Sequence, residues 1–180
     1  KIFGTSTCLE SFISKRCIFQ HNRNMRAVVQ RVDGSSVAVN GEVVGEFTGP
    51  GLMVLVGVSV DDDLTSCAPL ADKIWKLRIF SAEELRAKGI NVQSESAEVS
   101  AADARLPIMI ISQFTLFADT SRGRRPTWQQ AARGEQAEPM INELVRALRD
   151  LGAQVETGKF GADMKITQTC DGPMTILIEA

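Results

Sequence analysis

Three short segments of the chain carry residue types that could do chemistry, and the first directly follows an apolar run. Residues 112–115 read Ser-Gln-Phe-Thr, so two hydroxyls and an amide come immediately after the apolar residues 108–111. Polar groups just past a core strand are often placed there for binding or catalysis. The simpler interpretation is that Ser112 and Thr115 hydrogen-bond locally and cap the strand. The residues alone leave both interpretations open.

The second segment concentrates positive charge. Arg122, Arg124 and Arg125 lie within four positions, next to Gly123 and Pro126. The planar guanidinium group suits bidentate contact with phosphate, so this cluster could bind a nucleic-acid backbone. A solvated turn is the alternative, because Gly and Pro are common in turns.

The third segment comes just before the last apolar run and contains Cys170 and the pair Gly172-Pro173. An ordinary turn is the simplest interpretation of Gly-Pro, since only about 5–6% of X–Pro bonds in folded proteins are cis. Cys170 could act as a nucleophile only if a helix N-terminus or a basic neighbour such as Lys165 lowered the pKa of its thiol.

A shortage of imidazole excludes much of the familiar hydrolytic chemistry. His21 is the single histidine, and tyrosine does not occur. Residues 25–180 therefore lack the base of a Ser-His-Asp or Cys-His arrangement and the histidine ligands of a catalytic zinc. No Cys-x-x-Cys spacing occurs, so we expect no metal site, and Cys67 and Cys170 could be small buried side chains. The four cysteines are Cys8, Cys17, Cys67 and Cys170.

Composition indicates one globular domain, preceded by a segment of different character. The 180 residues are 44% hydrophobic and 23% charged, and the longest apolar run, residues 52–58, is too short to span a membrane. Residues 1–24 hold four basic side chains and one acidic one, whereas residues 25–180 hold 16 basic and 21 acidic ones. Residues 25–180 therefore have a net negative charge, which excludes general non-specific binding of nucleic acid over their surface. A local basic patch is still compatible with this charge.

Residues 1–24 are rich in hydroxyl groups and poor in acidic ones, which is typical of an organelle-targeting segment. The alternative is a disordered N-terminal extension or a remnant of upstream translation. We therefore expect a functional domain at 25–180. We also expect a cytoplasmic location, or a mitochondrial or plastid one if residues 1–24 are a transit segment.

The elements that must position these groups are mostly strands. Asn40-Gly41 between apolar runs predicts a tight hairpin, and Gly49-Pro50-Gly51 predicts a further turn before a buried strand at 52–56. Helices are expected from about residue 68 to 75, after an N-cap at 61–63, and over 139–152, while 83–104 is expected to be loop. The predicted fold is α+β: one strand-rich domain with antiparallel or mixed sheets and two main helices.

Taken together, the segments resemble one family. The motifs SQFTLFAD at 112–119, GRRP at 123–126, GKFGADM at 158–164 and DGPMT at 171–175 look like those of D-aminoacyl-tRNA deacylase, also called D-tyrosyl-tRNA deacylase. MRAVVQRV at 25–32 and ADKIWKLRIF at 71–80 agree with it in order and spacing. The resemblance covers residues 25–180.

This resemblance implies a chiral proofreading hydrolase. Such an enzyme cleaves the ester that joins a D-amino acid, or glycine, to the 3′-terminal adenosine of tRNA. The family implies a homodimer without metal or organic cofactor, acting on D-aminoacyl-tRNA and glycyl-tRNA and not at a membrane. The alternative is a non-catalytic tRNA-binding module on the same fold.

The resemblance also implies roles for individual residues. Ser112, Gln113 and Phe114 would form the active-site strand end, and Thr115 would be a nucleophile or a positioning group. A cis Gly172-Pro173, supported by Thr175, would enter the partner subunit's pocket and exclude L-amino acids. The 3′-terminal adenosine would be bound by Phe160, Gly161 and Met164. The acceptor-stem phosphates would be bound by Arg122, Arg124 and Arg125.

Two features depart from the family pattern. Asparagine is usual where this chain has Cys170, and a thiol is a weaker hydrogen-bond donor than an amide. Residues 83–104 are also longer and richer in serine than the family leads us to expect. A thiol-dependent hydrolase that uses Cys170 is therefore a second alternative.

Overall fold

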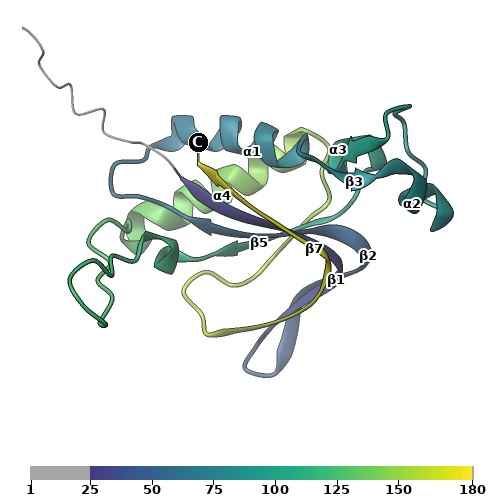
Figure 1. The fold of residues 1–180 in the computed structure, drawn as a ribbon. Coiled ribbons are helices and arrows are strands. Elements are labelled where there is room, and N and C mark those ends of the chain that lie inside the picture. Colours follow the sequence, from purple (N-terminus) through teal and green to yellow (C-terminus); the bar gives the residue numbers. More distant parts are fainter. Residues whose placement is uncertain (1–24, 180) are drawn as a thin grey trace, which may run out of the picture.

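The computed structural model describes residues 25–179, so the expectations for residues 1–24 lie outside the described part of the chain. A mixed sheet of five strands in the order β6-β5-β2-β1-β7 forms its centre (Figure 1). The antiparallel half pairs β1 (Arg26–Val39) with β2 (Glu42–Gly57) and with β7 (Met164–Glu179). In the parallel half, β5 (Ile108–Ser112) lies between β2 and β6 (Val155–Thr157).

The predicted hairpin at Asn40-Gly41 is confirmed. Both residues have positive φ, at 52° and 87°, which is the conformation that a two-residue turn between twisted strands requires. The turn predicted at 49–51 is wrong, because β2 continues through it and pairs Pro50 with Asp33 and Gly51 with Val32. Proline is tolerated at position 50 because β2 begins to pair with β5 only at Leu52. The missing N–H of Pro50 therefore removes no hydrogen bond between β2 and β5.

Both main helices lie on one face of the sheet (Figure 1). A short 3-10 turn, η1 (Leu64–Ser66), leads into α1 (Cys67–Trp75), close to the predicted start. The second helix, α4 (Gly134–Asp150), begins five residues before the predicted Pro139. Its first turn forms because the Arg133 carbonyl accepts from both Gln136 and Ala137, and Pro139 then forfeits a single N–H donor.

The predicted loop over 83–104 is wrong, since it contains two short helices and a strand. The helix α2 (Ala82–Ala87) and the helix α3 (Ala101–Ala104) flank β4 (Glu98–Ser100), which pairs with β3 (Arg78–Ser81) in a separate two-stranded sheet. Each helix has a serine N-cap, and Ser100 forms a capping box with Asp103. These bonds hold the pKa of Asp103 below its usual value.

Apolar side chains fill both faces of the sheet. The helix side buries Leu70 and Ile74 of α1 against Leu144 and Leu148 of α4, all without exposed surface. The opposite face carries a smaller cluster made by Val32, Val37, Phe47, Met53, Met109 and Ile111. Because β5 contributes to both clusters, its composition is that of a strand buried on two faces. Within residues 25–179 no helix is long and apolar enough to cross a membrane.

The packing of α4 predicts a large loss of stability when its buried face is truncated. Leu148→Ala should lower the free energy of unfolding by about 2–5 kcal/mol, because it leaves a cavity between helix and sheet. Leu151→Ala is the matched control, since Leu151 is 42% exposed, and it should change stability by about 0.5 kcal/mol or less. Urea unfolding of both variants measures the difference, and equal losses would contradict this packing.

Candidate functional site

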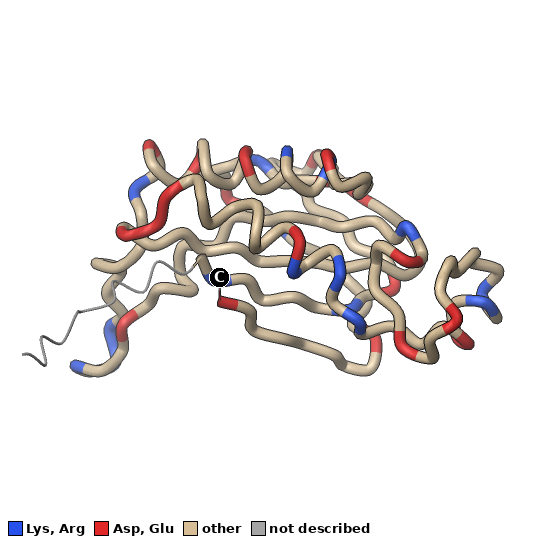
Figure 2. Tube along the Cα trace, turned by 90° about the horizontal axis from the view of Figure 1, so that it is seen from above, with Lys and Arg blue, Asp and Glu red and all other residues tan. Residues whose placement is uncertain are grey.

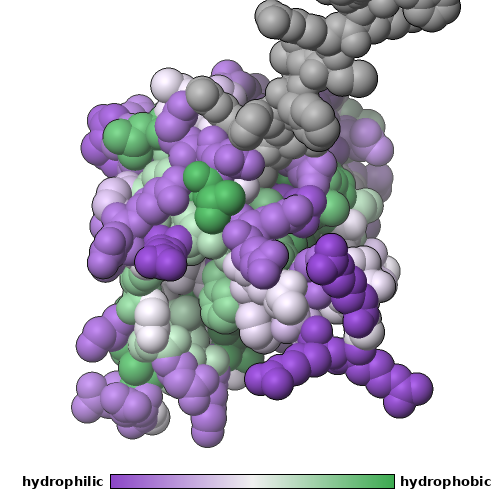
Figure 3. Space-filling model, turned by 90° about the vertical axis from the view of Figure 1, so that its left-hand side faces the viewer, coloured by the Kyte–Doolittle hydropathy of each residue, from purple (hydrophilic) through white to green (hydrophobic). Residues whose placement is uncertain are grey.

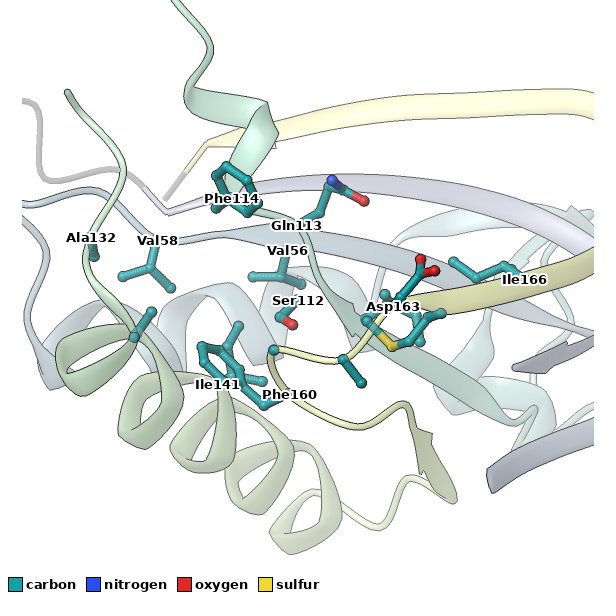
Figure 4. Close-up of a pocket in the computed structure, with 16 residues that line it drawn as sticks. Val56, Val58, Ser112, Gln113, Phe114, Ala132, Ile141, Phe160, Asp163 and Ile166 are labelled. Carbon is teal, nitrogen blue, oxygen red and sulfur yellow. The ribbon is translucent and has the colours of Figure 1, made fainter. Parts of the chain in front are cut away.

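A cavity of about 420 Å³ opens where the parallel strands end (Figure 4). Side chains converge on it from the ends of β2 and β5, from α4, from the segment that links β6 to β7, and from the start of β7. The lining combines apolar walls with a few polar groups, which is typical of small-ligand sites. Its members are Val56, Val58, Ile111, Ser112, Gln113, Phe114, Ala132, Gly134, Ala137, Ile141, Phe160, Gly161, Ala162, Asp163, Met164 and Ile166.

One wall is the segment that leaves β5. The backbone N–H of Gln113 donates to the carbonyl of Val56 at 2.7 Å, which ties this segment to the end of β2. The chain then turns through the 3-10 helix η2 (Phe114–Phe117), and within the described residues the backbone N–H of Phe114 donates no hydrogen bond. The side-chain amide of Gln113 donates to the hydroxyl of Thr115, which lies beside the cavity and does not line it.

The opposite wall is the segment 158–164, which crosses close over the sheet. A Cβ on Gly158 would lie 3.0 Å from Cδ1 of Ile111 and even closer to the sulfur of Met164, so a larger residue would require these two side chains to shift. This close passage brings Phe160, Gly161 and Met164 into the lining. Gly161 has a φ of 70°, a conformation that glycine adopts without strain.

Gly172-Pro173 lies in a wide bulge of β7 and does not line the cavity of its own chain. Gln30 pairs with Thr175 and Val32 with Cys170, so residues 171–174 lie opposite Arg31 alone. The Gly172-Pro173 peptide bond is cis, and Gly172 has a φ of 111°. The bulge therefore carries the backbone out of the regular ladder at this point.

Arg31 holds this bulge from β1. Its Nε lies 3.1 Å from Oδ2 of Asp171, and its Nη1 donates to the carbonyl of Ile79 at 2.7 Å. A Cβ on Gly172 would lie 2.9 Å from Nη2 of the same side chain. The Arg31 side chain is 15% exposed and the Asp171 side chain is 40% exposed, so solvent screens the Arg31–Asp171 ion pair less than a fully exposed pair.

The arginine cluster forms the exposed end of a closed loop. Asp119 and Thr127 exchange two backbone hydrogen bonds of 2.8 and 3.0 Å at its base. Arg122, Arg124 and Arg125 are exposed, and Figure 2 shows basic residues at the outer end of this loop. The Ser121 N–H donates to Asp119, which lowers the pKa of that carboxyl.

Comparison with known proteins decides the family. The family model for D-Tyr-tRNA(Tyr) deacylase matches residues 28–179. The chain belongs to this family. A protein of Streptomyces coelicolor named D-aminoacyl-tRNA deacylase is 50% identical over 155 residues, covering 86% of this chain and 99% of that protein. A Mycolicibacterium smegmatis protein of the same name is 48% identical over 157 residues, with 86% and 99% covered.

Two solved structures share the fold of this deacylase family member. One, described as c-Myc DNA Unwinding Element Binding Protein, superposes with a TM-score of 0.74 at 34% identity and covers 86% of this chain and 98% of its own. The other, a probable eukaryotic D-amino acid tRNA deacylase, has a TM-score of 0.72 at 16% identity, with 87% and 100% covered. The second likeness concerns the fold alone. Both agree with a single α+β domain built on a five-stranded sheet.

The structure brings together only part of the residue set that the resemblance implied. Six of those residues line the one cavity, namely Ser112, Gln113, Phe114, Phe160, Gly161 and Met164. Thr115 lies beside it, and the two remaining groups lie elsewhere. These groups are Gly172, Pro173 and Thr175 in β7, and Arg122, Arg124 and Arg125 in the 119–127 loop.

The two cysteines of the described residues differ from each other. Cys67 is buried as expected and donates to the carbonyl of Met140, and burial raises the pKa of its thiol to about 11. Cys170 is exposed, so the prediction that it is buried is wrong. Lys165, the basic neighbour suggested for Cys170, is not close to it, because Lys165 pairs with Ala38, five positions or about 16 Å along the strand.

Sequence reasoning missed Arg31 and Asp171 as a pair. The available signal was a charged residue inside the loosely alternating run 25–32, where the neighbouring residues Val29 and Val32 are fully buried. A charge at a strand position of this kind needs a partner. The partner is about 140 positions away in the chain, so the sequence alone could not identify it.

Proposed function

We propose that this chain hydrolyses the ester bond of D-aminoacyl-tRNA to release the D-amino acid and tRNA. The observation that carries the proposal is the cavity at the end of β5 in a member of the deacylase family. Its size suits one nucleoside and a small amino acid rather than a folded macromolecule. The 3′-terminal adenosine would occupy the cavity between Phe160 and Met164, with the ester directed toward the 112–115 segment.

The chemistry follows from the polarity of that segment. An aminoacyl ester is already activated, so polarisation of its carbonyl and a well-placed water are sufficient for hydrolysis. The unused backbone N–H of Phe114 would donate to the oxygen on which negative charge develops, as an oxyanion hole does. The ribose hydroxyl of the substrate would then help to orient the water. Ser112 and Gln113 would hold this geometry through their position at the strand end.

Thr115 acts in this proposal as a positioning group. Its hydroxyl accepts from the amide of Gln113, and no described carboxylate bonds to it. Asp163 is the acidic residue of the lining, and Figure 4 places its carboxylate across the cavity from Phe114. A threonine hydroxyl without a neighbouring base is a weak nucleophile.

Thr115→Ala tests this assignment. A positioning role predicts that the variant keeps turnover, with kcat lowered by no more than about 100-fold, because misplacement of a reacting group costs about that much. Single-turnover hydrolysis of D-aminoacyl-tRNA measures the change, and Thr115→Ser is the matched control. If Thr115→Ala folds and binds tRNA but loses turnover completely, while Thr115→Ser retains it, Thr115 is the nucleophile.

Selectivity for D-amino acids would come from Gly172-Pro173 of a partner subunit. Discrimination of 10⁴-fold needs about 5.5 kcal/mol, whereas a pocket that senses one methylene supplies about 1–3 kcal/mol. A rigid backbone wall against the L side chain can supply more. Arg31 and Asp171 would hold the wall in place, and Thr175 would support it from β7. Glycine has no side chain to clash, so glycyl-tRNA would also be a substrate.

A homodimer is part of this proposal because the cavity and Gly172-Pro173 do not meet within one chain. β7 is an edge strand of the sheet, and Leu177 and Met174 on it are 60% and 36% exposed. Exposed apolar side chains on an unpaired sheet edge favour contact with another chain. The exposed arginines 122, 124 and 125 would contact acceptor-stem phosphates without reading base sequence. The protein would work where aminoacyl-tRNA is found, in the cytoplasm, or in a mitochondrion or plastid if residues 1–24 direct it there.

A thiol-dependent hydrolase is the rival that Cys170 raises, and it makes a different prediction. Cys170 lies outside the cavity lining, so Cys170→Ser should leave the turnover of D-aminoacyl-tRNA within about threefold of the original, as surface substitutions do. Alkylation at pH 8 of a variant in which Cys8 and Cys17 are replaced by serine provides a parallel test. In that variant the other thiol besides Cys170 is Cys67, which is buried and whose pKa of about 11 keeps it protonated, and therefore unreactive, at that pH. Loss of turnover in both experiments would establish the thiol mechanism.

A non-catalytic tRNA-binding module is the remaining rival. Mixing the protein with D-aminoacyl-tRNA separates the two, since a deacylase releases the amino acid faster than spontaneous hydrolysis and a binding module protects the ester. Release is the outcome that the proposal requires.

A further inference from the structure

Two exposed aromatic side chains lie together at the edge of the cavity. Phe114 is 56% exposed and Trp128 is 42% exposed, and they are the exposed aromatic residues of the 25–179 region. Their ring centroids are 5.7 Å apart, with 65° between the ring planes. In an edge-to-face pair of this kind, each ring keeps a face that its partner does not cover. Core packing does not account for either ring, because both remain open to water.

The pair connects two features already described. Phe114 lines the cavity, while Trp128 follows directly after Thr127, which closes the base of the arginine loop. The order in space is therefore cavity, aromatic pair and basic loop. Figure 3 shows this end of the molecule, where hydrophobic surface lies beside hydrophilic side chains that project outward.

This order matches the chemistry of a single-stranded nucleic-acid end. A nucleoside fits the cavity, the next base has a π-face that can stack on an aromatic ring, and the phosphates that follow need cations. Arg122, Arg124 and Arg125 supply a local cluster of cations on a body that is acidic as a whole. An uncharged or acidic peptide would explain the aromatic rings, but a basic loop directly beside them favours a polyanion.

We infer that Phe114 and Trp128 form a stacking site for the nucleobase that precedes the 3′-terminal adenosine. The inference rests on the proposed function, because that function puts the terminal adenosine in the cavity. Stacking is tolerant of base identity, so the site adds affinity for any tRNA end and does not choose among tRNAs. Trp128 is thus a substrate-binding residue, outside the group that touches the ester.

The fluorescence of Trp128 provides a direct probe. The sequence has two tryptophans, and Trp75 is only 5% exposed, so quenching by an added nucleotide reports on Trp128. The ligand is the RNA trinucleotide CCA, compared with the same trinucleotide whose middle residue lacks its base. The full chain should bind CCA about 5- to 150-fold more tightly than the abasic form, with quenching only by CCA.

Variants separate stacking from folding. Trp128→Leu should remove the difference between the two trinucleotides and raise the KM for D-aminoacyl-tRNA, with the loss falling on KM rather than kcat. Trp128→Phe keeps a ring and should restore most of the preference. Gln129→Ala, at the neighbouring exposed position, is the matched control and should behave as the unmodified protein does.

The outcomes distinguish this inference from the proposed function. Hydrolysis of D-aminoacyl-tRNA with equal binding of CCA and its abasic form overturns the stacking site alone, as does an unchanged KM in Trp128→Leu. Base-dependent binding and quenching without hydrolysis supports the stacking site and overturns the deacylase. A pair that is covered by a second copy of the chain would show no quenching by either trinucleotide, which also overturns the inference.

Discussion

Parallel pairing of β5 between β2 and β6 is the constraint on which the site depends. Parallel neighbours cannot be joined by a tight turn, so each pair requires a long crossover. One crossover contains α1 and the small β3–β4 sheet, and the other contains η2, the arginine loop and α4. Both main helices cover the same face of the sheet (Figure 1). The carboxyl ends of all three strands consequently meet at one edge, and the cavity is at that edge.

The antiparallel half of the sheet carries the Gly172-Pro173 segment. β1 is the central partner of both β2 and β7, and it pairs with each over most of its length. The β1–β7 register shifts between Gln30 and Val32, where residues 171–174 form a bulge opposite Arg31. The ends of the parallel strands and the start of β7 thus build a pocket, while Gly172-Pro173, farther along β7, lies outside its lining. An arrangement of this kind supports a site completed by a second chain, which is the form that the proposed mechanism takes.

Local signals in the sequence predicted the elements that depend on local physics. Asn40-Gly41 specified the hairpin because few other residue pairs adopt two positive φ values, and the apolar stripe of 139–152 specified α4. The signals that failed were overridden by partners distant in the chain. The composition of Gly49-Pro50-Gly51 is typical of a turn, but pairing with β1 keeps this segment in a strand. The prediction of a loop over 83–104 did not take into account the Ser100–Asp103 capping box, which begins α3.

The site was predictable where it is one continuous segment and unpredictable where it is assembled from several. Residues 112–114 follow a recognisable buried strand, so their placement could be expected from the sequence alone. The contacts of Arg31 with Asp171 and of Phe114 with Trp128 join residues that no periodicity relates. Charge and aromatic content could mark these residues as unusual, but only the folded chain identifies their partners.

We propose that this strand-end cavity hydrolyses D-aminoacyl esters and rejects L-aminoacyl esters. The most direct test is a paired rate measurement on D- and L-aminoacyl-tRNA that carry the same side chain, using the full chain. We expect rapid release from the D-substrate, and we expect the L-substrate to decay at its spontaneous rate. Equal hydrolysis of the two would contradict the backbone wall at Gly172-Pro173, and hydrolysis of neither by a folded dimer would contradict the deacylase itself.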